Sequence, residues 1–145
     1  MKKFNWLILL LIGTISLVSS CKKKDKTDAC SLTEANFAGS YKIESVKYKA
    51  SASSPEIDGT SFLDACQLDD VTAFNVNHTY TYTDAGTTCS PSGDDSGTWS
   101  VSGSSSIIVD GDTAPVDNFS CSSFTISDTA VNTSGDKLSL TFKKQ

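Results

Sequence analysis

Apolar and polar residues alternate along most of the chain beyond residue 40. This period of two matches the spacing of side chains on one face of a β-strand. Strands are therefore predicted over residues 41–48, 71–76, 79–83, 97–101, 105–109, 120–126 and 137–143, with a further short one starting at Ala130 and Val131. The segments between them, above all 50–60 and 84–96, are rich in Gly, Ser, Pro and Asp and predict loops.

The alternation changes phase inside the first predicted strand. Tyr41 and Ile43 share one parity, whereas Val46 and Tyr48 share the other. One extra residue in a strand has this effect, so a bulge is expected at residues 44–45.

Two short helical turns are also predicted. Ser31-Leu-Thr-Glu34 has the form of an N-terminal capping box, which predicts one helical turn that ends by Gly39. Residues 62–67 are expected to add a second turn before the central strands begin.

The clearest hairpin lies in the middle of the chain. Its two arms are predicted to join at Asn77-His78, with Phe74 and Val76 on one side of the first arm. Seven or eight such short strands indicate an all-β fold rather than an α/β fold. The strand pattern fits a β-barrel or a sandwich, and a barrel also removes the exposed edges that a sandwich has to protect. The fold we expect is a small antiparallel up-and-down β-barrel of about eight strands.

The first 20 residues have the pattern of a bacterial export signal. Lys2 and Lys3 precede an apolar run, which is too short to serve confidently as a membrane span, and Val18-Ser-Ser-Cys21 resembles a lipobox. The interpretation is a signal peptide over 1–20 and a lipid-modified Cys21; an ordinary secretory signal is the alternative.

Three segments follow from that interpretation: the signal peptide, a charged tether over 21–29, and one domain over 30–145. The protein is then expected in the cell envelope, held by lipid, with the outer membrane as the expected location. Whether it faces the periplasm or the outside stays open.

The charge of the domain excludes one class of partner. Residues 29–145 hold 15 acidic residues, 6 lysines and no arginine, which gives a formal charge of −9. Nucleic acid binding relies on positive charge, so no nucleic acid partner is expected.

The cysteines form an even set once Cys21 is assigned to lipid. Cys30, Cys66, Cys89 and Cys121 remain, and an oxidising compartment predicts two disulfides among three connectivities. Cys66–Cys89 is favoured because these residues flank the central hairpin, which leaves Cys30–Cys121. The cysteines lack the close spacing of zinc ligands.

Catalytic and metal-binding chemistry is weakly represented. His78 is the single histidine and falls in a predicted turn, so we expect no enzyme activity. Acidic residues occur as two pairs, Asp69-Asp70 and Asp94-Asp95, and as a cluster of Asp110, Asp112 and Asp117 with Asn118. We interpret the first pair as a strand entry and the other groups as solvated turns, for which calcium binding is the alternative. We expect neither a metal nor a cofactor.

Several segments resemble the lipocalin-like domain of small lipoproteins of the Bacteroidetes type. The similarity covers nearly all of residues 30–143, although Tyr41 stands where that family usually has tryptophan. It is carried by Phe37-Ala-Gly-Ser-Tyr41, Cys66-Gln-Leu-Asp-Asp70, Phe74-Asn75, Gly97-Thr98-Trp99 and Leu138-Ser-Leu-Thr-Phe142. The resemblance implies a barrel with an apolar pocket rather than a particular reaction.

Seven aromatic residues of the predicted strands are the candidate lining of such a pocket: Tyr41, Phe74, Tyr80, Tyr82, Trp99, Phe124 and Phe142. Binding of a small apolar molecule by these residues is the leading functional hypothesis; a filled barrel interior is the alternative, which so short a domain favours because short strands enclose little volume. A second hypothesis is a structural module whose loops over 50–65 and 84–96 contact an envelope protein or a glycan. Thr113 and Thr129 resemble O-glycosylation acceptors and are expected on exposed loops.

Overall fold

A computed structural model describes residues 30–145; the predicted signal peptide, Cys21 and tether lie outside the described residues. The elements in chain order are α1 (Glu34–Phe37), β1 (Gly39–Lys49), β2 (Ile57–Asp58), the 3₁₀ turns η1 (Thr60–Phe62) and η2 (Ala65–Gln67), β3 (Val71–Phe74), β4 (Thr79–Thr83), β5 (Asp95–Ser102), β6 (Ser106–Val109), β7 (Asp112–Ser120), β8 (Ser123–Thr129) and β9 (Lys137–Lys144). Among these residues no helix is long and apolar enough to cross a membrane.

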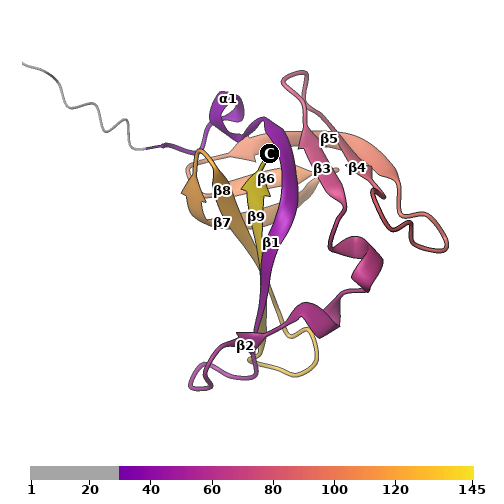
Figure 1. The fold of residues 1–145 in the computed structure, drawn as a ribbon. Coiled ribbons are helices and arrows are strands. Elements are labelled where there is room, and N and C mark those ends of the chain that lie inside the picture. Colours follow the sequence, from indigo (N-terminus) through magenta and orange to yellow (C-terminus); the bar gives the residue numbers. More distant parts are fainter. Residues whose placement is uncertain (1–29) are drawn as a thin grey trace, which may run out of the picture.

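Eight strands close into an antiparallel barrel (Figure 1). Strands β3 to β8 each pair with the next strand in sequence, and β1 closes the sheet by pairing with both β3 and β9. The two-residue strand β2 pairs only with β1. The predicted fold class, an up-and-down all-β barrel with a short N-terminal helical turn, is confirmed.

Strand β1 is the longest strand and carries the predicted bulge. Its pairing with β9 shifts register between Ile43 and Ser45. Residues 39–41 pair with β3, whereas residues 47–48 pair with β2. The far half of β1 therefore extends past β3 toward β2, with β9 paired along its other edge and β8 next to β9 (Figure 1).

Helical turn α1 covers one end of the barrel and supplies the centre of its core. Thr33 is the N-cap, because its side chain accepts a hydrogen bond from the Asn36 backbone N–H at 3.2 Å. The predicted cap at Ser31 is thus wrong by two residues. The turn ends at Phe37, which is fully buried, and the Tyr41 hydroxyl donates to the Phe37 carbonyl oxygen at 2.7 Å.

Strand β7 was not predicted from the alternation. It contains Pro115, Asp117 and Asn118, residue types that are rare in strands, and its register shifts between Asp117 and Ser120. Only Val116 is fully buried, so the apolar period is too short to recognise. The strand predicted over 120–126 instead begins at Ser123, after the turn that follows β7.

Two shorter predictions are also corrected. Val76 lies in the β3–β4 turn and is 83% exposed, so it does not share the buried side of Phe74. Residues 130 and 131 form a turn instead of a strand, because the backbone N–H groups of Val131, Asn132 and Thr133 all donate to the buried Asp136 carboxylate.

Both disulfides join the cysteines that the sequence analysis paired. Cys30–Cys121 ties the segment before α1 to the β7–β8 turn, and Cys66–Cys89 ties η2 to the β4–β5 loop. In the chain-entropy treatment these cross-links stabilise the fold by about 4 to 5 and about 3 kcal/mol respectively, since the first closes a much longer loop.

Candidate functional site

A hollow of about 460 Å³ lies beside the Cys66–Cys89 disulfide. Its floor and walls come from η2, the entry to β3, the end of β4 and the β4–β5 loop. The lining residues are Asp64, Cys66, Gln67, Asp70, Tyr82, Cys89, Ser90, Pro91 and Gly93. This volume falls within the range of roughly 300 to 1,000 Å³ that is usual for small-molecule sites.

The disulfide sets the width of the hollow. It holds the Cα atoms of Cys66 and Cys89 5.3 Å apart, although the two residues are 23 positions apart in sequence. Between them the chain passes through the whole β3–β4 hairpin. One wall is therefore covalently fixed to the other.

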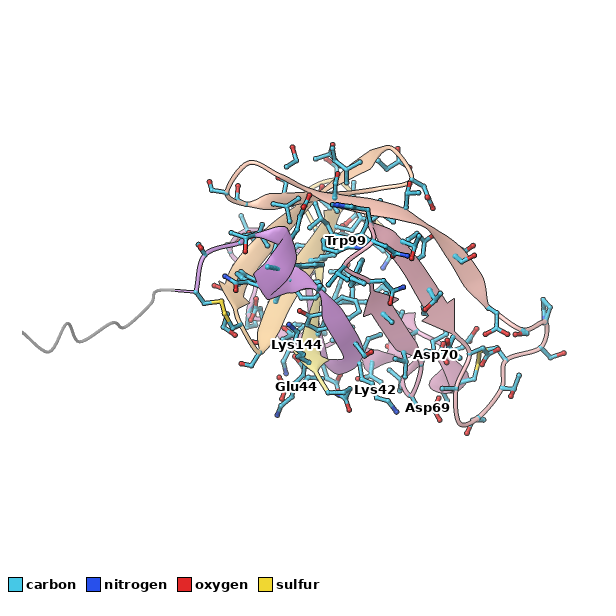
Figure 2. The ribbon with its side chains drawn as sticks, turned by 90° about the horizontal axis from the view of Figure 1, so that it is seen from above. Lys42, Glu44, Asp69, Asp70, Trp99 and Lys144 are labelled. Carbon is cyan, nitrogen blue, oxygen red and sulfur yellow. A yellow bond between two sulfur atoms is a disulfide. The ribbon has the colours of Figure 1, made fainter. Side chains whose placement is uncertain are left out.

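Aspartates at the β3 entry hold the β4–β5 loop in place. Asp70 Oδ1 accepts a hydrogen bond from the Ala85 backbone N–H at 3.0 Å, and Asp69 Oδ2 accepts one from the Thr87 N–H at 2.9 Å. Gly86 lies so close above the Asp69 carboxylate that a Cβ would collide with it, and its φ of +62° also favours glycine. Figure 2 shows Asp69 and Asp70 at the edge of the barrel.

Asp84 organises the same loop from within. Its carboxylate accepts hydrogen bonds from the backbone N–H groups of Cys89 and Gly93, each at 3.0 Å. These two groups, Gly93 first, hold the pKa of Asp84 below its ordinary value. The Asp84 backbone N–H in turn donates to Asp94 at 2.8 Å. The acidic pairs that looked like solvated turns thus fix backbone amides.

Tyr82 and Asp70 form a buried polar pair at the inner wall. The Tyr82 hydroxyl donates a hydrogen bond to Asp70 Oδ2, and Asp70 is only 4% exposed. Burial of Tyr82, followed by its bond to Asp70, raises the pKa of the tyrosine far above its ordinary value. Its hydroxyl therefore stays protonated at neutral pH and donates to the Asp70 carboxylate.

The outer part of the hollow offers groups that a ligand would meet. Asp64 and Gln67 are fixed relative to each other, because the Asp64 backbone N–H donates to the Gln67 side-chain oxygen at 2.8 Å. The lining also includes Pro91 and Tyr82, which add a ring and an aromatic surface. The arrangement suits a small molecule that has both hydroxyl groups and an apolar face.

One group of potential metal ligands borders the hollow. Atoms of Asp70, Asp84 and Cys89 lie within 4.8 Å of one another. The Cys89 sulfur is bonded to Cys66, so it is not a thiolate, and both aspartates already accept hydrogen bonds from the protein. The group therefore offers two carboxylates that are already hydrogen-bonded and a sulfur that is held in a disulfide.

The seven predicted pocket residues lie mainly in the core. The ring of Phe37 lies 4.7 Å from Phe124, 4.9 Å from Phe74 and 5.4 Å from Trp99, measured between ring centroids. Five of the seven are nearly inaccessible to solvent: Tyr41, Phe74, Tyr80, Trp99 and Phe124. Phe142 packs against this cluster, and Tyr82 both packs against it and lines the hollow.

These contacts correct the expectation of an aromatic-lined interior cavity. Rings at such separations fill the space between them, so the barrel centre has the packing of a protein core. The residue that the pocket hypothesis did not include was Phe37. The available signal was an apolar aromatic residue at the end of a capped turn, directly before the first strand.

The remaining candidate residues lie apart from the hollow. His78 is exposed in the β3–β4 turn, at the other end of the hairpin, with its Nδ1 3.6 Å from Glu34 Oε1. Asp110, which had been weighed as a calcium ligand, accepts hydrogen bonds from the Tyr80 hydroxyl and the Thr98 backbone N–H, both at 2.8 Å. Its role here is to fix a turn.

The two predicted glycosylation residues are both exposed. Thr113 lies at the start of β7, and Thr129 lies at the end of β8. They were expected on loops, and the structure places both at strand ends instead.

Comparison with known proteins gives one match. The family described as a lipocalin-like domain matches the chain over residues 37–140, a range that runs from the core residue Phe37 into β9. No curated protein matches the chain, and no solved structure matches it.

Proposed function

The chain belongs to the lipocalin-like domain family, and from that premise we propose that it is a non-enzymatic binding protein whose ligand site is the hollow beside Cys66–Cys89. The observation that carries this proposal is the rigidity of the hollow's walls. A disulfide joins them, and three aspartates accept backbone N–H groups of the loop that forms one of them. A site formed before the ligand arrives loses less conformational entropy on binding.

The lining favours a compact ligand rich in hydroxyl groups, such as a mono- or disaccharide. Asp64 and Gln67 supply hydrogen-bonding groups at the rim, and Tyr82 with Pro91 supplies flat apolar surface. A purely apolar ligand would displace water from the polar groups of Asp64 and Gln67 and offer them no hydrogen bond in return, which is unfavourable. The proposed ligand is therefore polar, in contrast to the apolar one first expected for the barrel interior.

We further propose that the protein is anchored in the cell envelope by lipid on Cys21. Support comes from the apolar run of residues 6–12 and from the lipobox-like Val18-Ser-Ser-Cys21. Such an anchor would hold the binding domain at a membrane through a short tether. The outer membrane is the location we propose.

Catalysis is not part of the proposal. The hollow's lining has no histidine, and His78 lies at the opposite end of the β3–β4 hairpin. Ser90 and Tyr82 are the hydroxyl groups of the lining, and no hydrogen bond joins either a histidine or Asp64 to Ser90 among the described residues.

The test is native mass spectrometry of the full chain extracted from membranes, with a panel of mono- and disaccharides as probes. The expected result is a mass shift with at least one sugar, which weakens about tenfold or more when Asp64 and Gln67 are both replaced by Ala. The matched control is Asp128→Ala, which removes an exposed carboxylate on β8. No shift with any sugar, or equal binding by the double variant, would reject the hollow as the site.

A further inference from the structure

Every lysine of the described domain lies on one pair of strands. β1 carries Lys42, Lys47 and Lys49, and β9 carries Lys137, Lys143 and Lys144. The domain has no other lysine and no arginine, and of its 15 acidic residues only Glu44 lies on these two strands. Positive charge is thus confined to one ribbon of an otherwise acidic domain.

Five of the six lysines are on the outer face of this ribbon. Val46 and Leu138 are buried, so the residues that alternate with them along each strand point outward. Lys144 is the exception, because its ammonium group lies 5.5 Å from the centre of the Tyr41 ring and donates to the Asn36 carbonyl oxygen at 2.9 Å. Figure 2 shows Lys42, Glu44 and Lys144 together on one side of the barrel.

Four of the outward lysines form cross-strand pairs. Lys42 pairs directly with Lys143, and Lys49 pairs directly with Lys137, across the β1–β9 ladder. Like charges in such positions repel and destabilise a sheet. Two carboxylates relieve this only in part: Glu44 lies 2.9 Å from Lys143, and Asp117 lies 3.6 Å from Lys137.

Between the lysines the face is polar and holds no large apolar side chain that a protein partner would bury. A shallow hollow of about 180 Å³ is lined there by Lys47, Glu56, Asp117, Asn118, Thr125, Ser127, Lys137, Ser139 and Thr141. Its hydroxyl groups pair across the β8–β9 ladder, at 3.0 Å for Ser127 with Ser139. Ammonium and hydroxyl donors in one surface match phosphate oxygens.

We propose that the outer face of β1 and β9 rests on the anionic phospholipid surface of the membrane, and so sets the orientation of the domain. The proposal rests on the lipid anchor at Cys21. The chain from Cys21 to Cys30 can span at most about 30 Å, which is less than the roughly 36 Å length of the 11-residue strand β1. An anchor at Cys21 therefore keeps the domain close enough to the membrane for its surface to touch the headgroups. With the rest of the domain acidic, any other face would be repelled by anionic headgroups.

The experiment uses the full chain, extracted from membranes and reconstituted into vesicles of phosphatidylcholine alone or with phosphatidylglycerol. Amine-reactive labelling, read by mass spectrometry, reports each lysine. We expect labelling of Lys47, Lys49, Lys137 and Lys143 to fall about threefold or more in the anionic vesicles and to recover in about 0.5 M salt. Lys144 is the internal reference, because it contacts the protein itself.

Charge variants sharpen the test. Lys47→Gln with Lys137→Gln should abolish the lipid-dependent protection of Lys49 and Lys143. Val76→Glu with Ser104→Glu changes the net charge equally at exposed turns away from the ribbon and should keep that protection.

The outcomes separate the two proposals. If the chain does not float with either vesicle, the anchor is wrong and the orientation falls with it. Flotation with equal labelling in both vesicles overturns the orientation alone. Protection by an added sulfated polysaccharide, and not by anionic vesicles, would also overturn it, because the face would then bind a polymer.

Discussion

The ring of Phe37, at the end of helical turn α1, lies 4.7 Å from the ring of Phe124 in β8. The first residue closes one end of the barrel and the second belongs to its wall, yet both are almost completely buried. A short turn before the first strand therefore fills the centre of the barrel. Because the centre is filled, the proposed ligand site lies beside the barrel wall instead of inside it.

Replacement of Phe37 by Ala should destabilise the protein by about 3 to 5 kcal/mol, because it leaves a cavity among Tyr41, Phe74, Trp99 and Phe124. Denaturant unfolding measures the loss. Val76→Ala is the control, since Val76 is 83% exposed and its truncation should change stability by no more than about 0.5 kcal/mol. A loss below about 1 kcal/mol for Phe37→Ala would contradict the central packing role.

Three of the four tyrosines should ionise late. Burial raises the pKa of Tyr41 to about 12, and hydrogen bonds to Asp110 and Asp95 raise that of Tyr80 further. An unfolded tyrosine ionises near pH 10, so the stability from these groups is complete below pH 10 and is lost as pH rises through the folded values. The absorbance of ionised tyrosine should therefore rise at a higher pH in the native protein than in the unfolded chain.

Single Tyr→Phe variants show which tyrosines ionise at the higher pH. Tyr80→Phe should remove one tyrosine from the late phase and leave the others in place. Phenolate absorbance that follows the same curve in the native and unfolded protein would show that the buried hydroxyl contacts do not form.

The alternation of side chains was sufficient to predict an all-β fold, because a strand that is buried on one face shows it directly in its sequence. The choice of a barrel over a sandwich was supported by the family resemblance. The change of parity between Ile43 and Val46 even located the bulge in β1. β7 was missed because Pro115, Asp117 and Asn118 hide its short apolar period. Its place is set by neighbours on both sides, β6 and β8, which is tertiary information that a local pattern lacks.

The ligand hollow was less accessible to prediction than the fold. Its cysteines could be paired from their positions around the hairpin, and the β4–β5 loop was recognised as a surface segment. The hydrogen bonds from Tyr82 to Asp70 and from Ala85 to Asp70, however, join residues 12 and 15 positions apart. Whether an aspartate accepts a backbone N–H depends on such distant contacts. The sequence therefore placed Asp69-Asp70 at a strand entry, where the structure has them, but did not show which groups they bind.

Acid should release the β4–β5 loop before the barrel unfolds. The pKa of Asp84 is held below its ordinary 3.8 by the N–H groups of Gly93 and Cys89. Its stabilising contribution is thus complete above pH 3.8 and is lost as pH falls through the lower folded value. Amide hydrogen exchange at Cys89 and Gly93, corrected for intrinsic rates, should accelerate in that range while the amide of Tyr41 stays protected.

The comparison variant is Asp84→Asn, which keeps the shape of the side chain and removes its charge. In this variant the amides of Cys89 and Gly93 should exchange faster at neutral pH, and the acceleration of their exchange in acid should disappear. An acid step that persists in this variant would assign the transition to another carboxylate.

Removal of the Cys66–Cys89 bridge, by serine at both positions, should free one wall of the hollow and leave the barrel closed. The loop entropy of the bridge predicts a loss of about 3 kcal/mol, and amide exchange over residues 84–94 should rise more than in β8 and β9. The matched variant replaces Cys30 and Cys121 by serine, which should cost more stability because the loop it opens spans 91 residues. That variant should nevertheless leave exchange over 84–94 unchanged, since neither cysteine borders the hollow. Equal exchange of this segment in both variants would mean that the aspartate contacts alone hold the loop, and that the disulfide is not what fixes the site.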